Sequence, residues 1–299
     1  MKLGDFYFLM KDKLLVIYSA GEAETITGLA FEHFTGLSKT ELRFNKEKEL
    51  TLAQIAELNK TLVELLQHKP IQYVLSEAWF YGMIFFVNES VLIPRPETEE
   101  LVDWILKELQ PADYRLQITN AQTSDIRHLQ ILDIGTGSGC IPISLKNKIG
   151  YAEITSIDIS KEALNIAQQN AINLNAKINF IEFDFLNENN WYQLNKYDII
   201  VSNPPYIPIK EKTILDKHVT EWEPSLALFV ADNDPLIFYK KIALFAQTHL
   251  KEKGQIFLEI HQDYAVQTKT LFDEQGFITE LKKDLNGNNR MIKAYYNII

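Results

Sequence analysis

The sequence is poor in three features that would place it in a special class of protein. It has a single cysteine, Cys140, among 299 residues, which excludes an internal disulfide and favours a reducing compartment. No apolar run approaches the roughly 20 residues that cross a bilayer, and the short apolar segment at residues 14–18 follows charged residues too closely to be a secretory signal. The six histidines have no metal-ligand spacing. We therefore expect a cytoplasmic protein with no membrane association and no bound metal.

Excess positive charge is also missing. Lysine and arginine number 30, against 40 aspartate and glutamate residues, for a formal net charge of −10. Neither the first 90 residues nor the remainder is basic, which argues against a stable complex with nucleic acid. The 46% apolar content is typical of a globular protein with a full hydrophobic core.

The first part of the chain has helical periodicity. Between Gly21 and Lys69 the apolar residues recur at steps of three and four, and Pro70 interrupts the run. The sequence predicts a small helical domain over residues 1–75. This segment is too short and too acidic to read nucleic acid, so we expect it to recognise a protein substrate.

A β-hairpin is predicted next. Residues 79–87 are aromatic and β-branched, and the turn-forming residues 88–90 separate them from the apolar residues 91–93. We expect this hairpin to form a linker over residues 76–95.

From Gln130 onward, short apolar segments alternate with helical ones. This alternation is typical of an α/β fold, in which a parallel sheet is covered on both faces. A helix after Pro96 and a polar surface loop over residues 111–129 precede the first strand, so the catalytic domain is expected over residues 96–299. The expected strands are residues 131–134, 154–157, 178–183, 199–201 and 256–260, followed by a terminal antiparallel pair, residues 276–281 and 290–296.

A glycine-rich turn follows the first predicted strand. Gly135-Thr136-Gly137-Ser138-Gly139 leads into an apolar helical segment, so three glycines lie where a strand meets a helix N-terminus. Glycine lets the backbone approach a ligand, and free N–H groups favour an anionic group. Asp158 ends the next strand, nineteen residues beyond Gly139, where a carboxylate can accept both hydroxyls of a ribose. The arrangement predicts a nucleoside-cofactor site.

Neighbouring residues indicate which nucleoside. The dinucleotide fingerprint G-x-G-x-x-G has its third glycine one residue later than here. Asp133, two positions before the first glycine, would repel a pyrophosphate but can meet an ammonium. After the third strand, Asp184 can accept from an adenine amine and Phe185 can stack on the ring, although Phe185 is equally consistent with a core residue. The pattern resembles that of S-adenosylmethionine-dependent methyltransferases, so we expect S-adenosylmethionine as cofactor.

The fourth strand ends in Asn203-Pro204-Pro205-Tyr206, a motif suited to methylating a planar nitrogen. The two N–H bonds of such a nitrogen must be held while it pyramidalises, and the Asn203 side-chain oxygen and the Pro204 carbonyl can accept them. Pro205 fixes the backbone, and Tyr206 can lie on the substrate plane. We take all four residues as substrate-binding, with Asn203, Pro204 and Tyr206 as catalytic and Asn203 also next to the cofactor. A plain turn after a strand is the alternative.

Further motifs point to one family. The chain resembles the HemK or PrmC family, the protein-glutamine N5-methyltransferases of peptide-chain release factors, from about residue 20 to its end. The motifs, in matching order, are Pro70-Ile71-Gln72-Tyr73, Phe80-Tyr81-Gly82, residues 92–99 (LIPRPETE), Glu223-Pro224, Leu258-Glu259-Ile260 and Lys283-Asp284-Leu285.

The resemblance implies an N-terminal helix bundle, a β-hairpin and a seven-stranded Rossmann-like catalytic domain. It implies that the glycine turn, Asp158, Asp184 and Phe185 hold S-adenosylmethionine. It also implies that Asn203 to Tyr206 hold the glutamine of the Gly-Gly-Gln loop of a release factor, whose side-chain amide nitrogen receives the methyl group.

Several alternatives stay open. The Asn-Pro-Pro-Tyr motif also occurs in enzymes that methylate adenine N6 or guanine N2, so a nucleic-acid amine methyltransferase is the alternative enzyme. A cofactor-binding adaptor without turnover is the non-enzymatic one. Arg95 and Glu97 either line the cleft or form an ion pair that fixes the hairpin. Ser76 departs from the family, which usually has glycine there.

Overall fold

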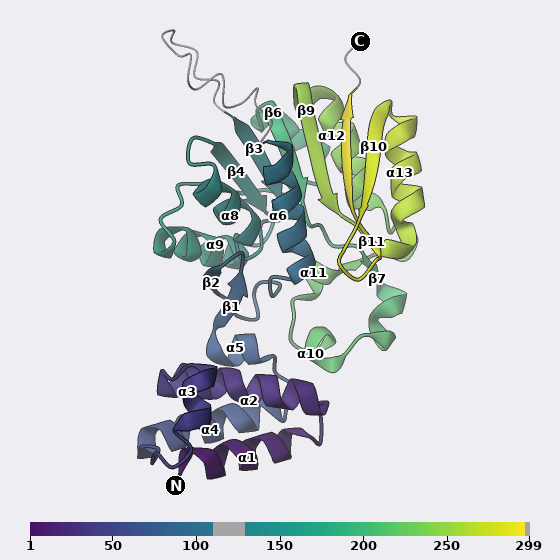
Figure 1. Ribbon diagram of the computed structural model, residues 1–299. Coiled ribbons are helices and arrows are strands. Elements are labelled where there is room, and N and C mark those ends of the chain that lie inside the picture. Colours follow the sequence, from purple (N-terminus) through teal and green to yellow (C-terminus); the bar gives the residue numbers. More distant parts are fainter. Residues whose placement is uncertain (110–128, 297–299) are drawn as a thin grey trace. The chain divides into compact units, whose positions relative to one another are not determined.

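The computed structural model describes residues 1–109 and 129–296 (Figure 1). They form two compact units: unit 1 is Met1–Glu77 with Leu215–Trp222, and unit 2 is Ala78–Ile214 with Glu223–Ile299. Except for Leu129, the loop predicted over residues 111–129 lies outside the described residues. No helix within the described ranges is long and apolar enough to cross a membrane.

Unit 1 is helical, as the periodicity predicts. The periodic segment begins at Gly21, so it did not reveal the first helix as an element, although that helix lies within the predicted domain of residues 1–75. Apolar faces meet in one core that includes Phe6, Met10, Phe31 and Leu58. The helices are α1 (Leu3–Leu14), α2 (Ala20–Thr35), α3 (Lys39–Phe44), α4 (Leu52–Leu65), α5 (Ile71–Leu75) and the short α10 (Lys217–Thr220).

The hairpin consists of β1 (Glu77–Phe80) and β2 (Met83–Phe86). Its turn is Tyr81-Gly82, with φ values of 50° and 75°. The expectation that residues 88–90 join the two strands of the hairpin is therefore wrong: a turn does form there, with the Val91 N–H donating to the Asn88 carbonyl at 3.1 Å, but residues 91–93 form no strand. A two-residue hairpin turn of this kind needs positive φ at both positions, and a tyrosine there conceals it in the sequence. Ser76 also has a positive φ, 57°, which explains why glycine suits that position.

The central sheet of unit 2 has seven strands in the order β10-β11-β9-β6-β3-β4-β5. The five strands from β9 to β5 in this order are parallel to one another, whereas β11 pairs antiparallel with both β9 and β10. Every strand predicted for this sheet is present, which confirms the α/β, Rossmann-like fold class. The strands are β3 (Gln130–Ile134), β4 (Glu153–Asp158), β5 (Asn179–Glu182), β6 (Tyr197–Ser202), β9 (Leu250–Glu259), β10 (Phe277–Lys283) and β11 (Asn289–Tyr296).

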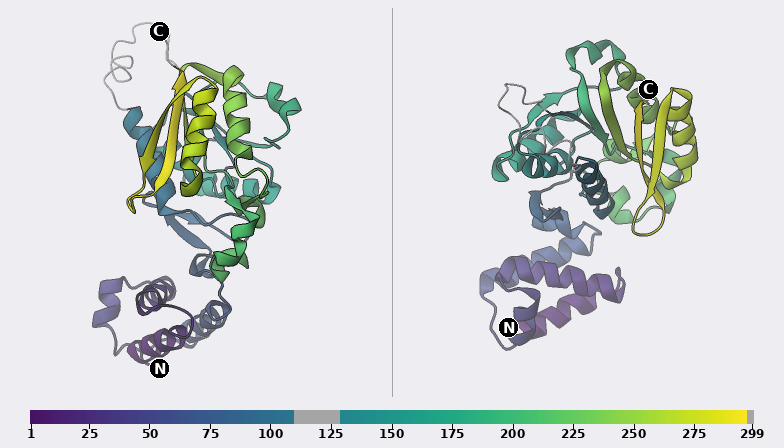
Figure 2. Two further views of the ribbon diagram at one scale, coloured as in Figure 1. Left: turned by 90° about the vertical axis from the view of Figure 1, so that its right-hand side faces the viewer. Right: turned by 45° about the horizontal axis from the view of Figure 1, so that its top comes forward.

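Helices cover both faces of this sheet (Figure 1). Neighbouring residues of β3 point to opposite sides: Ile131 packs in the core beneath α6, α8 and α9, and Leu132 packs in the core beneath α12 and α13. Figure 2 shows α12 and α13 side by side along the C-terminal strands. These helices are α6 (Pro96–Glu108), α8 (Cys140–Lys148), α9 (Lys161–Asn173), α12 (Ile237–His249) and α13 (Ala265–Glu274).

Short elements complete unit 2. The helix predicted after Pro96 is α6, and Pro96 itself occupies its first turn. The chain after β6 forms β7 (Ile207–Pro208), a 3₁₀ helix (Ile209–Ile214), α11 (Ser225–Leu228) and β8 (Phe229–Val230), and β7 pairs with β8. Two further 3₁₀ helices span Glu188–Gln193 and Gln262–Tyr264.

Candidate active site

Chemistry-bearing residues gather at one edge of the sheet. The carboxyl ends of its parallel strands lie side by side, as their pairing register requires. The glycine turn follows β3, Asp158 ends β4, Asp184 follows β5, Asn203 follows β6, and Glu259 ends β9. Ligands of open α/β sheets bind at this edge.

The three glycines of the turn have the same backbone conformation but different surroundings. Their φ values are 76°, 53° and 81° for Gly135, Gly137 and Gly139, which disfavour any other residue. A Cβ on either of the first two would meet nothing within 4 Å, so the backbone there borders open space. A Cβ on Gly139 would lie 3.0 Å from Ile143 Cδ1 and 3.2 Å from Ala167 Cβ. The first two therefore leave room for a ligand, and the third allows close packing between α8 and α9.

A cavity lies in front of this turn. Of the predicted residues, it is lined by Gly135, Gly137, Asp158, Asp184, Phe185, Asn203 and Pro205. The remaining predicted residues, Asp133, Thr136, Ser138, Gly139, Pro204 and Tyr206, are not among its lining residues.

The apolar part of the cavity wall was not predicted from the sequence. Leu92, Ile159, Leu226 and Phe238 line it. Ile159 is 50% exposed and Leu226 is 61% exposed, which leaves apolar surface available to a flat ring. A signal for Ile159 exists in the sequence, because it directly follows the acidic residue at the end of a strand.

Asp158 is partly engaged within the protein. Its Oδ2 accepts from the Gly137 N–H at 2.9 Å, and its Oδ1 accepts from the Ser160 N–H at 2.9 Å. Burial raises the pKa of Asp158, and these backbone bonds oppose the shift. A carboxylate offers about four lone-pair positions, so the side chain can still accept two hydroxyls.

Asp133 lies behind the glycine turn. The side chain is fully buried, and Oδ2 accepts from Ser156 Oγ at 2.6 Å, which lies 3.1 Å from Thr136 Oγ1. Burial raises its pKa to about 7, against the effect of these hydroxyls. The observed contacts make Asp133 a support of the turn, and a direct contact with a cofactor ammonium stays a prediction.

Phe185 is a core residue that also borders the cavity, and its stacking on an adenine ring stays a prediction. Its ring stacks on Trp191, with 5.5 Å between centroids, and meets Phe245 edge-on. It belongs to the core and also lines the cavity. Asp184 is exposed, and its Oδ1 accepts from the Leu186 N–H at 3.0 Å.

A hydrogen-bonded network lies behind the Asn-Pro-Pro-Tyr motif. Asn203 Nδ2 donates to Thr98 Oγ1 at 3.1 Å, and Thr98 Oγ1 donates to Glu259 Oε2 at 2.6 Å. Tyr206 Oη donates to Glu259 Oε1 at 3.1 Å. Glu259 is 1% exposed. Burial raises its pKa, opposed by the Thr98 hydrogen bond and by the charge of Arg290.

The predicted site residues did not include Thr98 or Glu259. Both lie in motifs that carry the family resemblance, and a carboxylate at the end of an inner strand is a usable signal. Asn203 and Thr98 are 105 positions apart in the sequence, and Thr98 and Glu259 are 161 positions apart. No local sequence pattern reveals contacts over such separations.

The structure answers the question left open for Arg95. Its Nη2 lies 2.5 Å from Glu223 Oε1, and the Glu223 side chain is completely buried. Arg95 therefore forms an ion pair with Glu223, and neither Arg95 nor Glu97 lines the cavity. The Cys140 thiol is buried, which raises its pKa to about 12, so it is a core residue and not a ready nucleophile.

Comparisons with known proteins agree with this architecture. The Methyltransferase small domain family matches residues 115–221, and the PrmC N-terminal domain family matches residues 17–75. Among solved structures, the hMettl16 catalytic domain in complex with MAT2A 3′UTR hairpin 6 has a TM-score of 0.53 and 14% sequence identity, over 82% of each chain, which shows a shared fold. Fold and domain match together define a methyltransferase.

Full-length relatives identify the family. The release factor glutamine methyltransferase of Flavobacterium psychrophilum is 43% identical over 284 residues, 95% of each chain. The protein of the same name from Streptococcus pneumoniae is 38% identical over 296 residues, 98% of each chain. The chain belongs to the release factor glutamine methyltransferase family.

Proposed function

We propose that this protein transfers a methyl group from S-adenosylmethionine to the side-chain amide nitrogen of the glutamine in the Gly-Gly-Gln loop of peptide-chain release factors. Membership of the family supports the reaction and the substrate class. One structural observation carries the proposal: Asn203 and Pro205 line the same cavity as Gly135, Gly137 and Asp158. The amide-binding motif and the nucleoside-binding motif therefore open onto one space.

The cavity suits a cationic nucleoside. S-Adenosylmethionine, when bound, supplies an electrophilic methyl group on a sulfonium. The described residues that line the cavity include Asp158 and Asp184 but no lysine, arginine or histidine, a lining that would disfavour a pyrophosphate. Open space before Gly135 and Gly137 gives the backbone room for a ligand, and the spare lone pairs of Asp158 suit a ribose.

Asn203 and Pro204 are proposed to hold the substrate amide. Because Asn203 Nδ2 donates to Thr98, its Oδ1 is the atom left to accept a substrate N–H, and the Pro204 carbonyl accepts the other. These bonds strengthen as positive charge develops on the nitrogen. The methylated amide then releases one proton, for which no strong base is required. Tyr206, fixed through its hydroxyl by Glu259, covers the amide plane.

Unit 1 is proposed to contact the release factor. Support comes from the match of residues 17–75 to the PrmC N-terminal domain family. A recognition surface outside the cavity would lower the KM of an intact factor relative to a short peptide that carries the same glutamine.

The proposal is tested by offering labelled S-adenosylmethionine with purified release factor, the short peptide, DNA and ribosomal RNA in parallel. Label in the glutamine of the factor, with a lower KM than for the peptide, is the expected result. Label in nucleic acid alone would select the amine methyltransferase alternative, and equal KM values would remove the role of unit 1.

Substitution of Asn203 distinguishes a role in methyl transfer from a role in forming the turn after β6. Asn203→Ala should lower single-turnover rates on the peptide by on the order of 10²–10³-fold, the scale for loss of one preorganised polar group. Asn203→Asp keeps an acceptor and should fall between wild type and alanine. The exposed Asn195, with no side-chain role in the site, provides the matched control Asn195→Ala, which should behave as wild type. An Asn203→Ala enzyme as fast as wild type would leave Asn203 only a turn residue.

A further inference from the structure

The proposed function requires one particular orientation of the Asn203 side chain. An asparagine amide has a donor end and an acceptor end of nearly equal size. Only the acceptor end, Oδ1, can receive an N–H from the substrate. If the side chain flips, an NH₂ group faces the substrate N–H bonds, and the contact becomes repulsive.

The contacts behind Asn203 define that orientation. The Thr98 hydroxyl has one proton, and it donates this proton to Glu259 Oε2 at 2.6 Å. The lone pairs of Thr98 Oγ1 are then the only groups that it can offer to Asn203, so it can accept from Nδ2 but cannot donate to Oδ1. Asn203 Nδ2 lies 3.1 Å from this oxygen.

The hydrogen bonds of Glu259, at the other end of the network, are also fixed. Glu259 Oε1 accepts from Tyr206 Oη at 3.1 Å, so both carboxylate oxygens receive a hydroxyl proton. Thr98 is 2% exposed and Glu259 is 1% exposed, which keeps competing water away from both groups. The backbone of Glu259 is held as well, because the buried Tyr239 Oη donates to its carbonyl at 3.2 Å.

We infer that Thr98 and Glu259 are positioning residues for methyl transfer, which set the donor and acceptor ends of Asn203 and hold the Tyr206 ring through one buried carboxylate. The inference rests on the proposed function, since it deepens the role of Asn203 in that reaction. Neither side chain touches the substrate, so their loss affects turnover through Asn203 and leaves cofactor binding intact.

Thr98→Val is the sharpest test, because it removes the hydroxyl and keeps the shape of the side chain. We expect kcat on the glutamine peptide to fall about tenfold, the equivalent of one hydrogen bond, with the peptide KM and the S-adenosylmethionine Kd changed less than twofold. Thr98→Ser retains the hydroxyl and should restore kcat to near wild type.

A matched control is available in the same unit. Thr268 on α13 is fully buried, and its hydroxyl has no hydrogen-bond partner among the described residues. Thr268→Val therefore removes a buried hydroxyl outside the network and should leave kcat unchanged. Unchanged kcat in Thr98→Val, an equal loss in Thr98→Ser, or an equal loss in Thr268→Val would overturn the inference.

A second variant covers the case in which Thr98→Val does not fold. Glu259→Gln keeps the size of the side chain but introduces an NH₂ donor, which forces either Thr98 or Tyr206 to reverse its hydrogen bond. We expect a similar fall in kcat. Where Thr98→Val does fold, the double variant Thr98→Val/Glu259→Gln should lose less than the product of the two single losses, as for residues of one network. Wild-type kcat in Glu259→Gln would contradict the inference.

A measurement without turnover separates this inference from the proposed function. The side-chain NH₂ of Asn203 should give an NMR signal shifted by its bond to Thr98, and this shift should disappear in Thr98→Val and remain in Thr98→Ser. A wild-type enzyme that does not methylate glutamine would end the proposed function while this signal still reports the network. An Asn203 signal insensitive to Thr98→Val would end the inference alone.

Discussion

Polar groups find their partners in different ways in the two units. In unit 1, α2, α3 and α4 each begin with a capping box, in which Ser19, Ser38 and Thr51 exchange hydrogen bonds with a residue three positions later. These bonds are exposed. In unit 2, the carboxylates of Asp133 and Glu259 are buried, and their partners lie 23 to 161 positions away.

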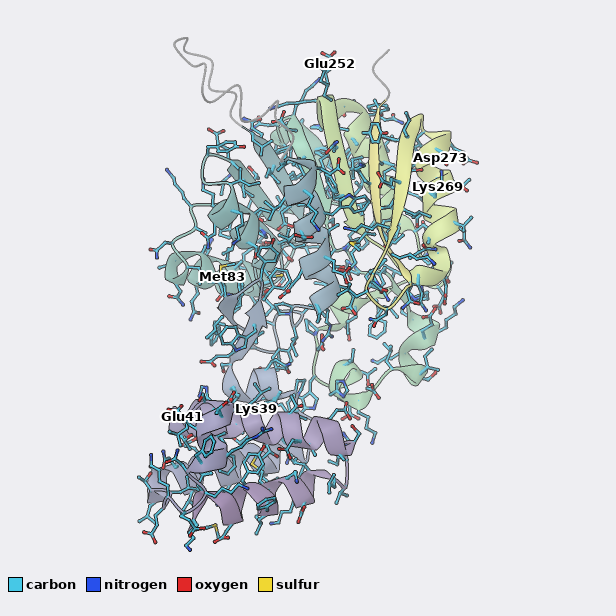
Figure 3. The ribbon with its side chains drawn as sticks, viewed as in Figure 1. Lys39, Glu41, Met83, Glu252, Lys269 and Asp273 are labelled. Atoms are coloured by element: carbon cyan, nitrogen blue, oxygen red, sulfur yellow. The ribbon has the colours of Figure 1, made fainter. Side chains whose placement is uncertain are left out.

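This difference indicates where a single substitution has a large effect. An exposed polar group exchanges its protein partner for water at little cost, whereas a buried one loses its partner without replacement. The ion pair between Lys269 and Asp273, one turn apart on the surface of α13 (Figure 3), belongs to the first kind, although it lies in unit 2. Burial, and not the unit alone, therefore separates the polar groups that have distant partners from those that have local ones.

The largest expected effect is at the cavity proposed to hold the cofactor. Asp158→Ala should weaken S-adenosylmethionine binding by about 10²–10⁴-fold, since two charge-assisted hydrogen bonds of about 1.5–3 kcal/mol each are lost. Release of the Gly137 N–H, which Asp158 holds, acts in the same direction. Calorimetric titration with S-adenosylmethionine measures this loss of affinity. Glu182→Ala changes the exposed carboxylate paired with Asp158 in the sheet register and should have no effect; unchanged affinity in Asp158→Ala would refute the ribose assignment.

The glycine turn and Asp158 show what the sequence can predict. A strand end, a glycine-rich turn and an acidic residue at the next strand end are local features with fixed spacing, so all seven strands of the sheet and the place of Gly135, Gly137 and Asp158 at one cavity were predictable. The hairpin turn was not, because Tyr81 adopts a conformation that its residue type conceals.

The network behind Asn203 shows what the sequence cannot predict. Thr98 lies in the first turn of a helix. Its sequence neighbours do not show that its hydroxyl donates to Glu259 at the end of β9 and accepts from Asn203 in the loop after β6. Such contacts arise from tertiary packing between elements distant in the chain. The same holds for the ion pair between the half-buried Arg95 and the buried Glu223, whose partners are 128 positions apart.

A buried carboxylate should also make stability depend on pH. The pKa of Asp133 is about 7 in the folded protein, against 3.8 for the ordinary group. As pH rises from about 4 to 7, Asp133 loses its proton in the unfolded chain but keeps it in the folded protein. The free energy of unfolding is therefore highest below pH 4 and falls by up to about 4 kcal/mol by the time pH exceeds 7. Asp133→Asn should remove this loss.

Urea unfolding at pH 5 and pH 8 measures the effect. Asp133→Asn should show a smaller fall in unfolding free energy between the two values than wild type. Asp12→Asn, which changes an exposed carboxylate on α1 of unit 1, should keep the wild-type difference. Identical differences in all three proteins would mean that Asp133 is ionised in the fold throughout this range.

The smallest expected effect sharpens the comparison from the side of unit 1. Ser19 caps α2 by accepting from the Glu22 N–H, and the Glu22 carboxylate accepts from the Ser19 N–H at 3.0 Å. Ser19→Ala should destabilise unit 1 by about 1 kcal/mol, the usual cost of an exposed cap, while kcat and cofactor affinity stay at wild-type values. Ser19→Gly, which costs only a few tenths of a kcal/mol at such a position, is the matched control for the helix start. Denaturant unfolding and peptide turnover measured together decide the outcome: if Ser19→Ala lowers kcat as strongly as Thr98→Val, exposed caps in unit 1 influence the site as much as the buried network does, and the contrast between the two kinds of polar group fails.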